Sequence, residues 1–318
     1  MKHVLVVLPV EDRHVHKLEE AGKGCSFDFT FGEEPTAERI AQADVILGNV
    51  PAERICASER LELLQLSSAG ADPYIKPGVL ASNTVLCNAT GAYGKAVSEH
   101  AFAMTLMLQK KLHLYRDAQR GALWSDAGTV VSMADAVVLV VGLGDIGLRF
   151  ARMCKAMGAY VIGVRRRAGE RPEGVDELCL TEELDALLPR ADVVASFLPG
   201  SPGTYHTYTA ERFARMKESA IFINCGRGGA VDGAVLADAL QQGRIAAAGI
   251  DVTDPEPLPA DSPLWALDNL MITPHVSGFY HLPETFERVV DIAAENLSAH
   301  LAGRPLRNVV DFETGYKR

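Results

Sequence analysis

Three stretches in the second half of the sequence each place one chemically useful side chain after a strand-like apolar run. Arg227 lies between glycines in INCGRGGAVD, Glu256 lies between prolines in GIDVTDPEPLP, and His275 follows a proline in MITPHVSGF. An arginine can hold a carboxylate, a histidine can exchange a proton near neutral pH, and a glutamate can orient that histidine. A lone histidine after a strand is more often structural, but these three residues together favour acid–base chemistry. Carboxyl ends of strands are also where open α/β sheets bind ligands.

A glycine-rich loop lies upstream of these residues, in VVLVVGLGDIGLRFA. Gly142, Gly144 and Gly147 have the GxGxxG spacing, after a strand pattern and at the start of a helix pattern. These glycines permit a tight turn, a close approach of the backbone to a pyrophosphate, and close packing of the helix on the sheet. The alternative is an ordinary strand-to-helix turn. We predict a dinucleotide site here, with Asp145 and Ile146 also in contact with the cofactor.

The next strand pattern, VIGVRRR, ends in the arginines Arg165, Arg166 and Arg167. In a dinucleotide site, an acidic residue about 20 residues past the glycines usually binds the ribose hydroxyls. No Asp or Glu follows this strand before Glu170, and a guanidinium pairs well with a phosphate. Arg165 and Arg166 therefore predict NADP(H) in preference to NAD(H). The alternatives are a solvated basic loop and an arginine that stacks on adenine.

Short apolar runs alternate with longer helical patterns along the chain. The strand-like runs cover residues 3–9, 43–50, 61–68, 84–90, 136–144, 160–166, 191–199, 219–226 and 245–252. Such continuous runs are typical of strands buried on both faces of a parallel sheet. The alternation predicts an α/β protein with two lobes, each a doubly wound parallel sheet.

Two long helix patterns, over residues 93–121 and 283–303, separate and follow these two sets of strands. The tail after the second helix has no lobe of its own to complete, so we expect it to return to the first lobe. We therefore predict a discontinuous substrate-binding domain from residues 1–98 plus 285–318, and a dinucleotide-binding domain from residues 99–284. The first lobe has no glycine loop after its first strand, which favours a role in substrate binding.

The length, net charge, cysteine spacing and apolar segments of the chain limit which kinds of partner it can bind. A length of 318 residues suggests two domains, and a net charge of −10 disfavours nucleic-acid binding. The six cysteines are scattered without metal-ligand spacing, which predicts free thiols in a reducing compartment and no metal site. The N-terminal apolar run lacks a signal-peptide cleavage pattern, and no apolar segment approaches the length of a membrane span. We expect a cytoplasmic protein that binds neither membranes nor nucleic acid.

These motifs, in this order, resemble the D-isomer-specific 2-hydroxyacid dehydrogenase family, which includes glyoxylate/hydroxypyruvate reductases and phosphoglycerate dehydrogenases. The resemblance covers nearly the whole chain, through SSAGADPY, GAYGKAVSEHAFAMTLML, VVGLGDIG, FLPGSPGTYH, MKESAIFINCGRGGAVD, DVTDPEPLP and TPHVSG. It implies a Rossmann dinucleotide-binding domain, a flavodoxin-like substrate domain, and reversible hydride transfer between a nicotinamide and a small 2-oxo or D-2-hydroxy acid. It also implies that His275 is the proton donor, that Glu256 orients it, and that Arg227 binds the substrate carboxylate and polarises the ketone.

The resemblance implies further contacts and an assembly. Substrate contacts are implied for Ala69 and Gly70, and cofactor contacts for Pro199, Thr204, Cys225 and Asp251. No basic partner is identifiable beside Cys225, so we interpret that thiol as packing and not as a nucleophile. The implied assembly is a homodimer whose nucleotide domains pair through the region of the first long helix.

Two other interpretations stay open. A dinucleotide-sensing protein of the corepressor type would keep the fold and the nucleotide site but would turn over poorly. A phosphoglycerate dehydrogenase is the second alternative. The stretch TGAYGKAVSEH departs from the commoner version in the family, so Tyr93 and Lys95 can shape the substrate pocket differently. The preferred acid therefore stays open.

Overall fold

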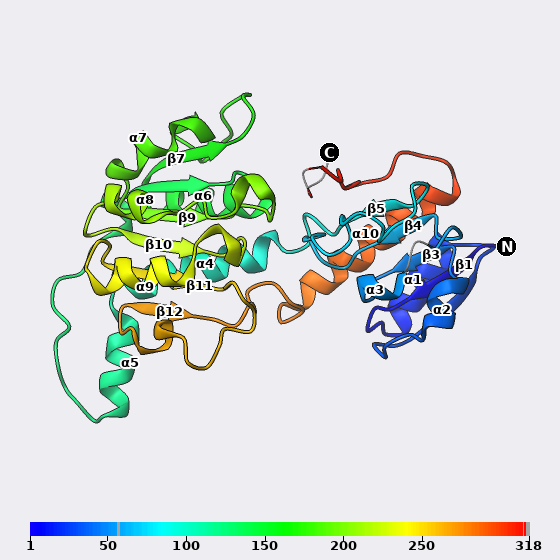
Figure 1. Ribbon diagram of the computed structural model, residues 1–318, viewed down its shortest axis with the longest axis horizontal. Coiled ribbons are helices and arrows are strands. Elements are labelled where there is room, and N and C mark those ends of the chain that lie inside the picture. Colours follow the sequence, from blue (N-terminus) through cyan, green and yellow to red (C-terminus); the bar gives the residue numbers. More distant parts are fainter. Residues whose placement is uncertain (56–57, 314, 316–318) are drawn as a thin grey trace. The chain divides into compact units, whose positions relative to one another are not determined.

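The computed structural model describes residues 1–55, 58–313 and 315, and Cys56 lies outside the described residues. The chain forms two compact units, the first from Met1–Tyr93 with Tyr280–Arg318 and the second from Gly94–Phe279 (Figure 1). The boundaries predicted from the sequence fall after residues 98 and 284 instead. No helix among the described residues is long and apolar enough to cross a membrane.

The first unit contains a parallel sheet with strand order β2-β1-β3-β4-β5, which is the flavodoxin-like order. Its strands are β1 (His3–Val6), β2 (Ser26–Phe29), β3 (Val45–Leu47), β4 (Leu63–Gln65) and β5 (Val85–Cys87). Its helices are α1 (Asp12–Ala21), α2 (Ala37–Gln42), α3 (Ala52–Ile55) and α10 (Pro283–Leu301). Val4 and Val6 pack in the cluster that contains residues of α1 and α10, and Leu5 packs in the cluster on the other face. Both faces are therefore apolar, as the continuous runs predict.

The end of the chain belongs to the first unit. After α10, Val309 forms an antiparallel bridge with Cys87 at the end of β5. Within α10, the side chain of Asn296 donates to Oε1 of Gln65 in β4 at 2.6 Å and to the carbonyl oxygen of Arg307 at 2.8 Å. These bonds satisfy buried polar groups where the returning segment meets the sheet.

The second unit contains a parallel sheet with strand order β12-β11-β10-β9-β6-β7-β8. Counted from β6 as its own first strand, this is the Rossmann order 3-2-1-4-5-6 with one further strand at the edge. Its strands are β6 (Val137–Val141), β7 (Tyr160–Arg165), β8 (Glu177–Leu180), β9 (Val193–Ser196), β10 (Ile221–Asn224), β11 (Ala247–Ile250) and β12 (Leu270–Ile272). The expected fold class, with two doubly wound parallel sheets, is confirmed.

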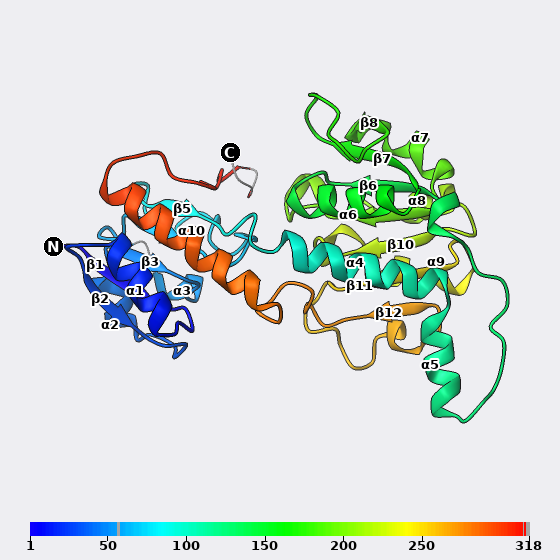
Figure 2. The same cartoon turned by 180° about the vertical axis from the view of Figure 1, so that it is seen from behind.

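Helices cover the second sheet, and α4 packs against α6 and against β10 and β11 (Figure 2). The α-helices are α4 (Gly94–Gln109), α5 (Leu112–Arg120), α6 (Asp145–Ala156), α7 (Leu184–Leu187), α8 (Ala210–Arg215) and α9 (Gly233–Gln241). The short 3-10 helices are η1 (Met133–Asp135), η2 (Thr181–Glu183), η3 (Leu188–Arg190), η4 (Pro202–Thr204), η5 (Gly228–Ala230) and η6 (Pro263–Ala266).

The long helix predicted over residues 93–121 is wrong as a single element. The chain breaks between α4 and α5, where Lys111 has a left-handed backbone with φ 55°. A left-handed residue interrupts the hydrogen-bond ladder of a right-handed helix. The break contains neither proline nor glycine, so the sequence gives no local signal for it.

Candidate active site

The side chains of His275 and Glu256 form a hydrogen-bonded pair in the second unit. The ring nitrogen Nδ1 of His275 lies 2.8 Å from Oε2 of Glu256, and the other carboxylate oxygen accepts from the backbone N–H of Thr253 at 3.0 Å. Glu256 comes from the loop after β11, and His275 comes from the loop after β12. Because both carboxylate oxygens are engaged, the ring has a fixed partner at Nδ1, which leaves Nε2 for another molecule. The two side chains are 49% and 39% exposed, so solutes can reach the pair.

Asp251 holds the loop that carries His275. Its carboxylate, with the residue only 1% exposed, accepts from the Thr273 hydroxyl at 2.6 Å and from the Val276 N–H at 3.0 Å. Ser277 donates its N–H to the same carboxylate at 3.2 Å. His275 has φ 52°, a conformation that costs an L-residue roughly 1–3 kcal/mol and persists only when the surroundings impose it. The geometry therefore makes Asp251 a support of the histidine, and its predicted contact with the nicotinamide carboxamide stays a prediction.

His100 belongs to the same network, although the sequence motifs assign it no role. Its Nε2 lies 3.0 Å from the Thr273 hydroxyl and 4.0 Å from Oδ1 of Asp251. The residue sits on α4, where it interrupts an otherwise apolar helix face. That polar interruption was the available signal, but it names no partner, because the partner is 173 residues away in the sequence.

Arg227 follows β10 and begins a tight loop against the segment that carries Glu256. The flanking glycines are required, because a Cβ at Gly226 would lie 2.6 Å from the Leu198 carbonyl oxygen and one at Gly228 would overlap the Thr253 backbone. The half-buried arginine donates from Nη1 to its neighbour's carbonyl oxygen at 2.9 Å. The arginine loop and the glutamate loop therefore pack directly on each other within one unit.

The glycine loop between β6 and α6 fits a bound dinucleotide. Gly142 has φ 100°, and a Cβ there would lie 2.7 Å from the Phe197 carbonyl oxygen. A Cβ at Gly147 would overlap the Gly142 carbonyl, so α6 lies close against the loop. Gly144 is the N-cap of α6 and carries no side chain that would cover the helix N-terminus. Exposed N–H groups at a helix N-terminus are a common binding site for a pyrophosphate.

Asp145 and Ile146 occupy the first turn of α6. Oδ1 of Asp145 accepts from Nε of Arg149 at 3.0 Å, and a Cβ on Gly94 of α4 would overlap the Asp145 carboxylate. The carboxylate is therefore turned toward Arg149 and α4. Because a carboxylate repels a pyrophosphate, we interpret the predicted Asp145 contact as one through its backbone N–H.

The arginines predicted to bind the cofactor end β7, next to the glycine loop. The Gly142 N–H donates to the Val164 carbonyl oxygen at 3.0 Å, one residue before Arg165. Arg165 donates from Nη2 to the Glu170 carbonyl oxygen at 3.1 Å, while Arg166 is exposed. Two guanidinium groups thus stand at the strand end where the second ribose of a dinucleotide binds in a Rossmann fold.

Three further predicted cofactor residues follow β9 and β10. The Thr204 hydroxyl donates to the Pro199 carbonyl oxygen at 2.6 Å, which closes the turn after β9. Cys225 is 5% exposed, and burial raises the pKa of its thiol. A neutral buried thiol fits packing and not nucleophilic chemistry.

The two predicted substrate residues, Ala69 and Gly70, lie after β4 in the first unit.

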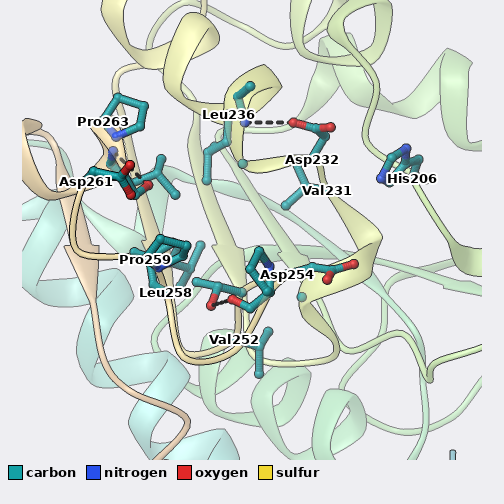
Figure 3. A pocket seen from close by; sticks show the side chains of 18 of the residues that line it. His206, Val231, Asp232, Leu236, Val252, Asp254, Leu258, Pro259, Asp261 and Pro263 are labelled. Carbon is teal, nitrogen blue, oxygen red and sulfur yellow. Dashed lines mark hydrogen bonds between the residues drawn. The ribbon is translucent and has the colours of Figure 1, made fainter.

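A cavity of about 450 Å³ lies in the second unit (Figure 3). Its lining combines apolar residues such as Leu236 and Leu258 with the carboxylates of Asp232, Asp254 and Asp261. Among the described residues that line it, neither the histidine–glutamate pair nor the glycine loop appears. The cavity borders the loops that carry Arg227 and Glu256, through Gly228 and Thr253.

Comparison with known proteins relates the chain to one enzyme family. Residues 102–277 match the model of the D-isomer specific 2-hydroxyacid dehydrogenase, NAD binding domain. Glyoxylate/hydroxypyruvate reductase B of Escherichia fergusonii is 32% identical, over 87% of this chain and 87% of its own length. D-3-phosphoglycerate dehydrogenase of Methanocaldococcus jannaschii is 29% identical, over 98% of this chain and 60% of its own length. The NADPH-dependent glyoxylate/hydroxypyruvate reductase of Sinorhizobium meliloti, solved with NADP and sulfate, superposes with a TM-score of 0.83 at 26% identity, over 99% of this chain and 100% of that one.

Proposed function

The chain belongs to the D-isomer specific 2-hydroxyacid dehydrogenase family and is an NAD(P)-dependent oxidoreductase, and from that premise we propose that it reduces a small 2-oxo acid, reversibly, to the D-2-hydroxy acid. The observation that carries the proposal is the 2.8 Å bond between Nδ1 of His275 and Glu256. It leaves Nε2 for a substrate, which is what a general acid for a ketone oxygen requires.

The roles of the side chains follow from the needs of the reaction. The reduced nicotinamide, when bound, supplies the hydride that adds to C2. His275 donates its Nε2 proton to the ketone oxygen, and it takes the proton back in the reverse direction. Glu256 keeps the ring in the donating orientation and stabilises the imidazolium charge. Arg227 binds the carboxylate and polarises the ketone through charge-assisted hydrogen bonds.

The preferred cofactor is NADP(H). The support is the pair Arg165 and Arg166 at the end of β7, where an acidic residue would otherwise favour the 2′-hydroxyl of NAD(H). A guanidinium presents forked donors that suit the 2′-phosphate. The Sinorhizobium meliloti reductase of the same fold is NADPH-dependent.

Cofactor oxidation tests the proposal directly. NADPH and NADH would each be offered with glyoxylate, hydroxypyruvate, pyruvate and bulkier 2-oxo acids. We expect turnover of a small acid with NADPH well above that with NADH. Binding of either cofactor without turnover of any acid would contradict the enzyme proposal and favour the corepressor-type interpretation.

Phosphoglycerate oxidation is the second candidate, and the similarity to the Methanocaldococcus jannaschii enzyme favours it. The same assay, run with 3-phosphoglycerate and NADP⁺ or NAD⁺, separates the two. Oxidation of 3-phosphoglycerate faster than reduction of any small 2-oxo acid would replace the first candidate with the second.

We further propose that the protein is a homodimer in which a second copy covers α5 and the segment after it. None of the described residues of α5 is buried, although Leu112 and Tyr115 give it an apolar face. Trp124, just beyond the helix, is fully exposed. An unpartnered apolar patch of this kind marks a protein contact. Sedimentation of the wild type and of Trp124→Ser tests this, with a dimer expected to weaken in the variant.

The cytoplasmic location stays a prediction.

A further inference from the structure

The loop after β4 in the first unit has every one of its carbonyl oxygens bonded. The Ser67 carbonyl accepts from the Tyr93 hydroxyl at 2.5 Å, and the Ser68 carbonyl accepts from the Ala89 N–H at 2.9 Å. The Ala69 carbonyl accepts from the Asn88 side-chain amide at 2.8 Å, and the Gly70 carbonyl accepts from the Ser68 hydroxyl at 2.7 Å. Four bonds on four consecutive carbonyls fix every peptide plane of the loop.

Fixing the carbonyls also fixes the N–H groups, because the two point in opposite directions across a trans peptide. The Ser67 carbonyl shares its peptide with the Ser68 N–H, and the next two carbonyls share theirs with the N–H groups of Ala69 and Gly70. Among the residues that the structure describes, these three N–H groups have no acceptor. Successive N–H groups that lie in a bend and have no acceptor are available to bind an anion.

Tyr93 donates the hydrogen bond that holds the Ser67 carbonyl. Its side chain is largely buried, and burial together with the neighbouring Tyr280 raises the pKa of its phenol. The hydroxyl therefore keeps its proton across the physiological range. Tyr280 in turn packs against Phe286 of α10, with ring centroids 4.8 Å apart. The phenol that bonds Ser67 is thus braced by the returning segment of the same unit.

We propose that Tyr93 is a positioning residue that makes the Ser68 N–H a third donor to the substrate carboxylate, beside those of Ala69 and Gly70. This inference rests on the proposed function for the identity of the anion. Removing the phenol oxygen releases the Ser67–Ser68 peptide, so one N–H loses its fixed direction while the other two keep theirs. The defect should therefore appear in binding of the acid and not in the proton transfer, whose groups lie in the second unit.

Steady-state kinetics of Tyr93→Phe in the full-length protein provide the first test. We expect KM for the best 2-oxo acid to rise about tenfold, with kcat within about twofold and the dissociation constant for NADPH unchanged. Tyr74→Phe is the matched control, because the Tyr74 hydroxyl donates to the Val50 carbonyl oxygen at 2.8 Å in the same unit and to none of the four loop carbonyls. An unchanged KM in Tyr93→Phe, or an equal rise of KM in Tyr74→Phe, would overturn the proposal.

A binding measurement separates this inference from the proposed function. The amide resonances of Ser68, Ala69 and Gly70 would be followed while oxalate is added to the protein with NADP⁺. We expect all three to shift in the wild type, and the Ser68 shift to be lost in Tyr93→Phe. If the wild type turned over no 2-oxo acid but showed these shifts, the proposed function would fail while the anion site stood. A wild type without an oxalate-induced shift at Ser68 would refute the third donor.

Discussion

The backbone N–H of His275 donates to the backbone carbonyl oxygen of Asp251 at 2.7 Å, and the Asp251 carboxylate accepts from residues on both sides of the histidine. The aspartate thus holds a left-handed turn closed around the histidine. This places the strained residue and the group that supports it at the ends of two neighbouring strands, β11 and β12. The orientation of His275 is therefore set twice, at its backbone by Asp251 and at its ring by Glu256.

Asp251→Asn tests the backbone support. An amide has one acceptor oxygen in place of two, so at least one N–H or hydroxyl of the turn is left unpaired at a cost of about 1–3 kcal/mol. We expect a lower Tm and a fall in kcat of roughly 10–100-fold, as the turn around His275 relaxes. Asp232→Asn is the control, since Asp232 caps α9 through the Ala234 N–H and asparagine caps equally well. A wild-type kcat in Asp251→Asn would show that catalysis does not depend on the support that Asp251 gives to His275.

His275→Ala tests the proton donor. A general acid contributes about 10²–10⁴-fold, so we expect kcat to fall by that factor while NADPH still binds, as measured by fluorescence titration. His206→Ala is a suitable control, because His206 lies in the same unit and also has a positive φ, 49° against 52°. Both variants carry the same backbone strain. Full activity in His275→Ala would exclude the assigned role.

The strands that the sequence predicted are those buried on both faces. The predicted strand ranges omit three edge strands, β2, β8 and β12, and polar residues such as Asp28 and Glu177 break the apolar run in β2 and β8. An edge strand faces solvent along one side and needs no continuous apolar sequence, so its signal is weak. The break at Lys111 was missed for a different reason, because it is set by packing and not by a local residue type.

The candidate site also contains residues that the sequence predicted and residues that it did not. The sequence motifs indicated Glu256 and His275 as partners, and the structure brings their side chains together. The support from Asp251 and His100 could not be predicted, because it depends on which strand ends become neighbours. The role of Tyr93 was equally hidden, since its partner Ser67 is 26 residues away and contributes only a backbone carbonyl.

Low pH should make the first unit less stable, because the Asp28 carboxylate becomes protonated. Its side chain bonds Arg39, and that hydrogen bond, opposed by a smaller desolvation effect, lowers the pKa of the carboxyl below its usual value. A carboxyl with a lowered folded-state pKa adds stability above its unfolded pKa and loses it as pH falls through the folded one. Both side chains are partly exposed, so we expect a contribution below about 1 kcal/mol. Urea unfolding of Asp28→Asn between pH 3 and 7 should then show a smaller loss at low pH than the wild type. Parallel curves would contradict this.

Arg165→Asp tests whether Arg165 binds the 2′-phosphate of NADPH. An aspartate at the end of β7 would repel the 2′-phosphate of NADPH and accept from the 2′-hydroxyl of NADH. The loss of a charge-assisted bond of about 1.5–3 kcal/mol predicts a shift in the ratio of kcat/KM for NADPH over NADH on the order of 10²-fold. Arg167→Asp makes the same charge change at an exposed neighbour that we assign no cofactor contact. A similar shift in both variants would mean that the effect is the general field of the basic loop. A shift confined to Arg165→Asp would establish a specific contact, because only a bonded guanidinium distinguishes two positions so close in sequence.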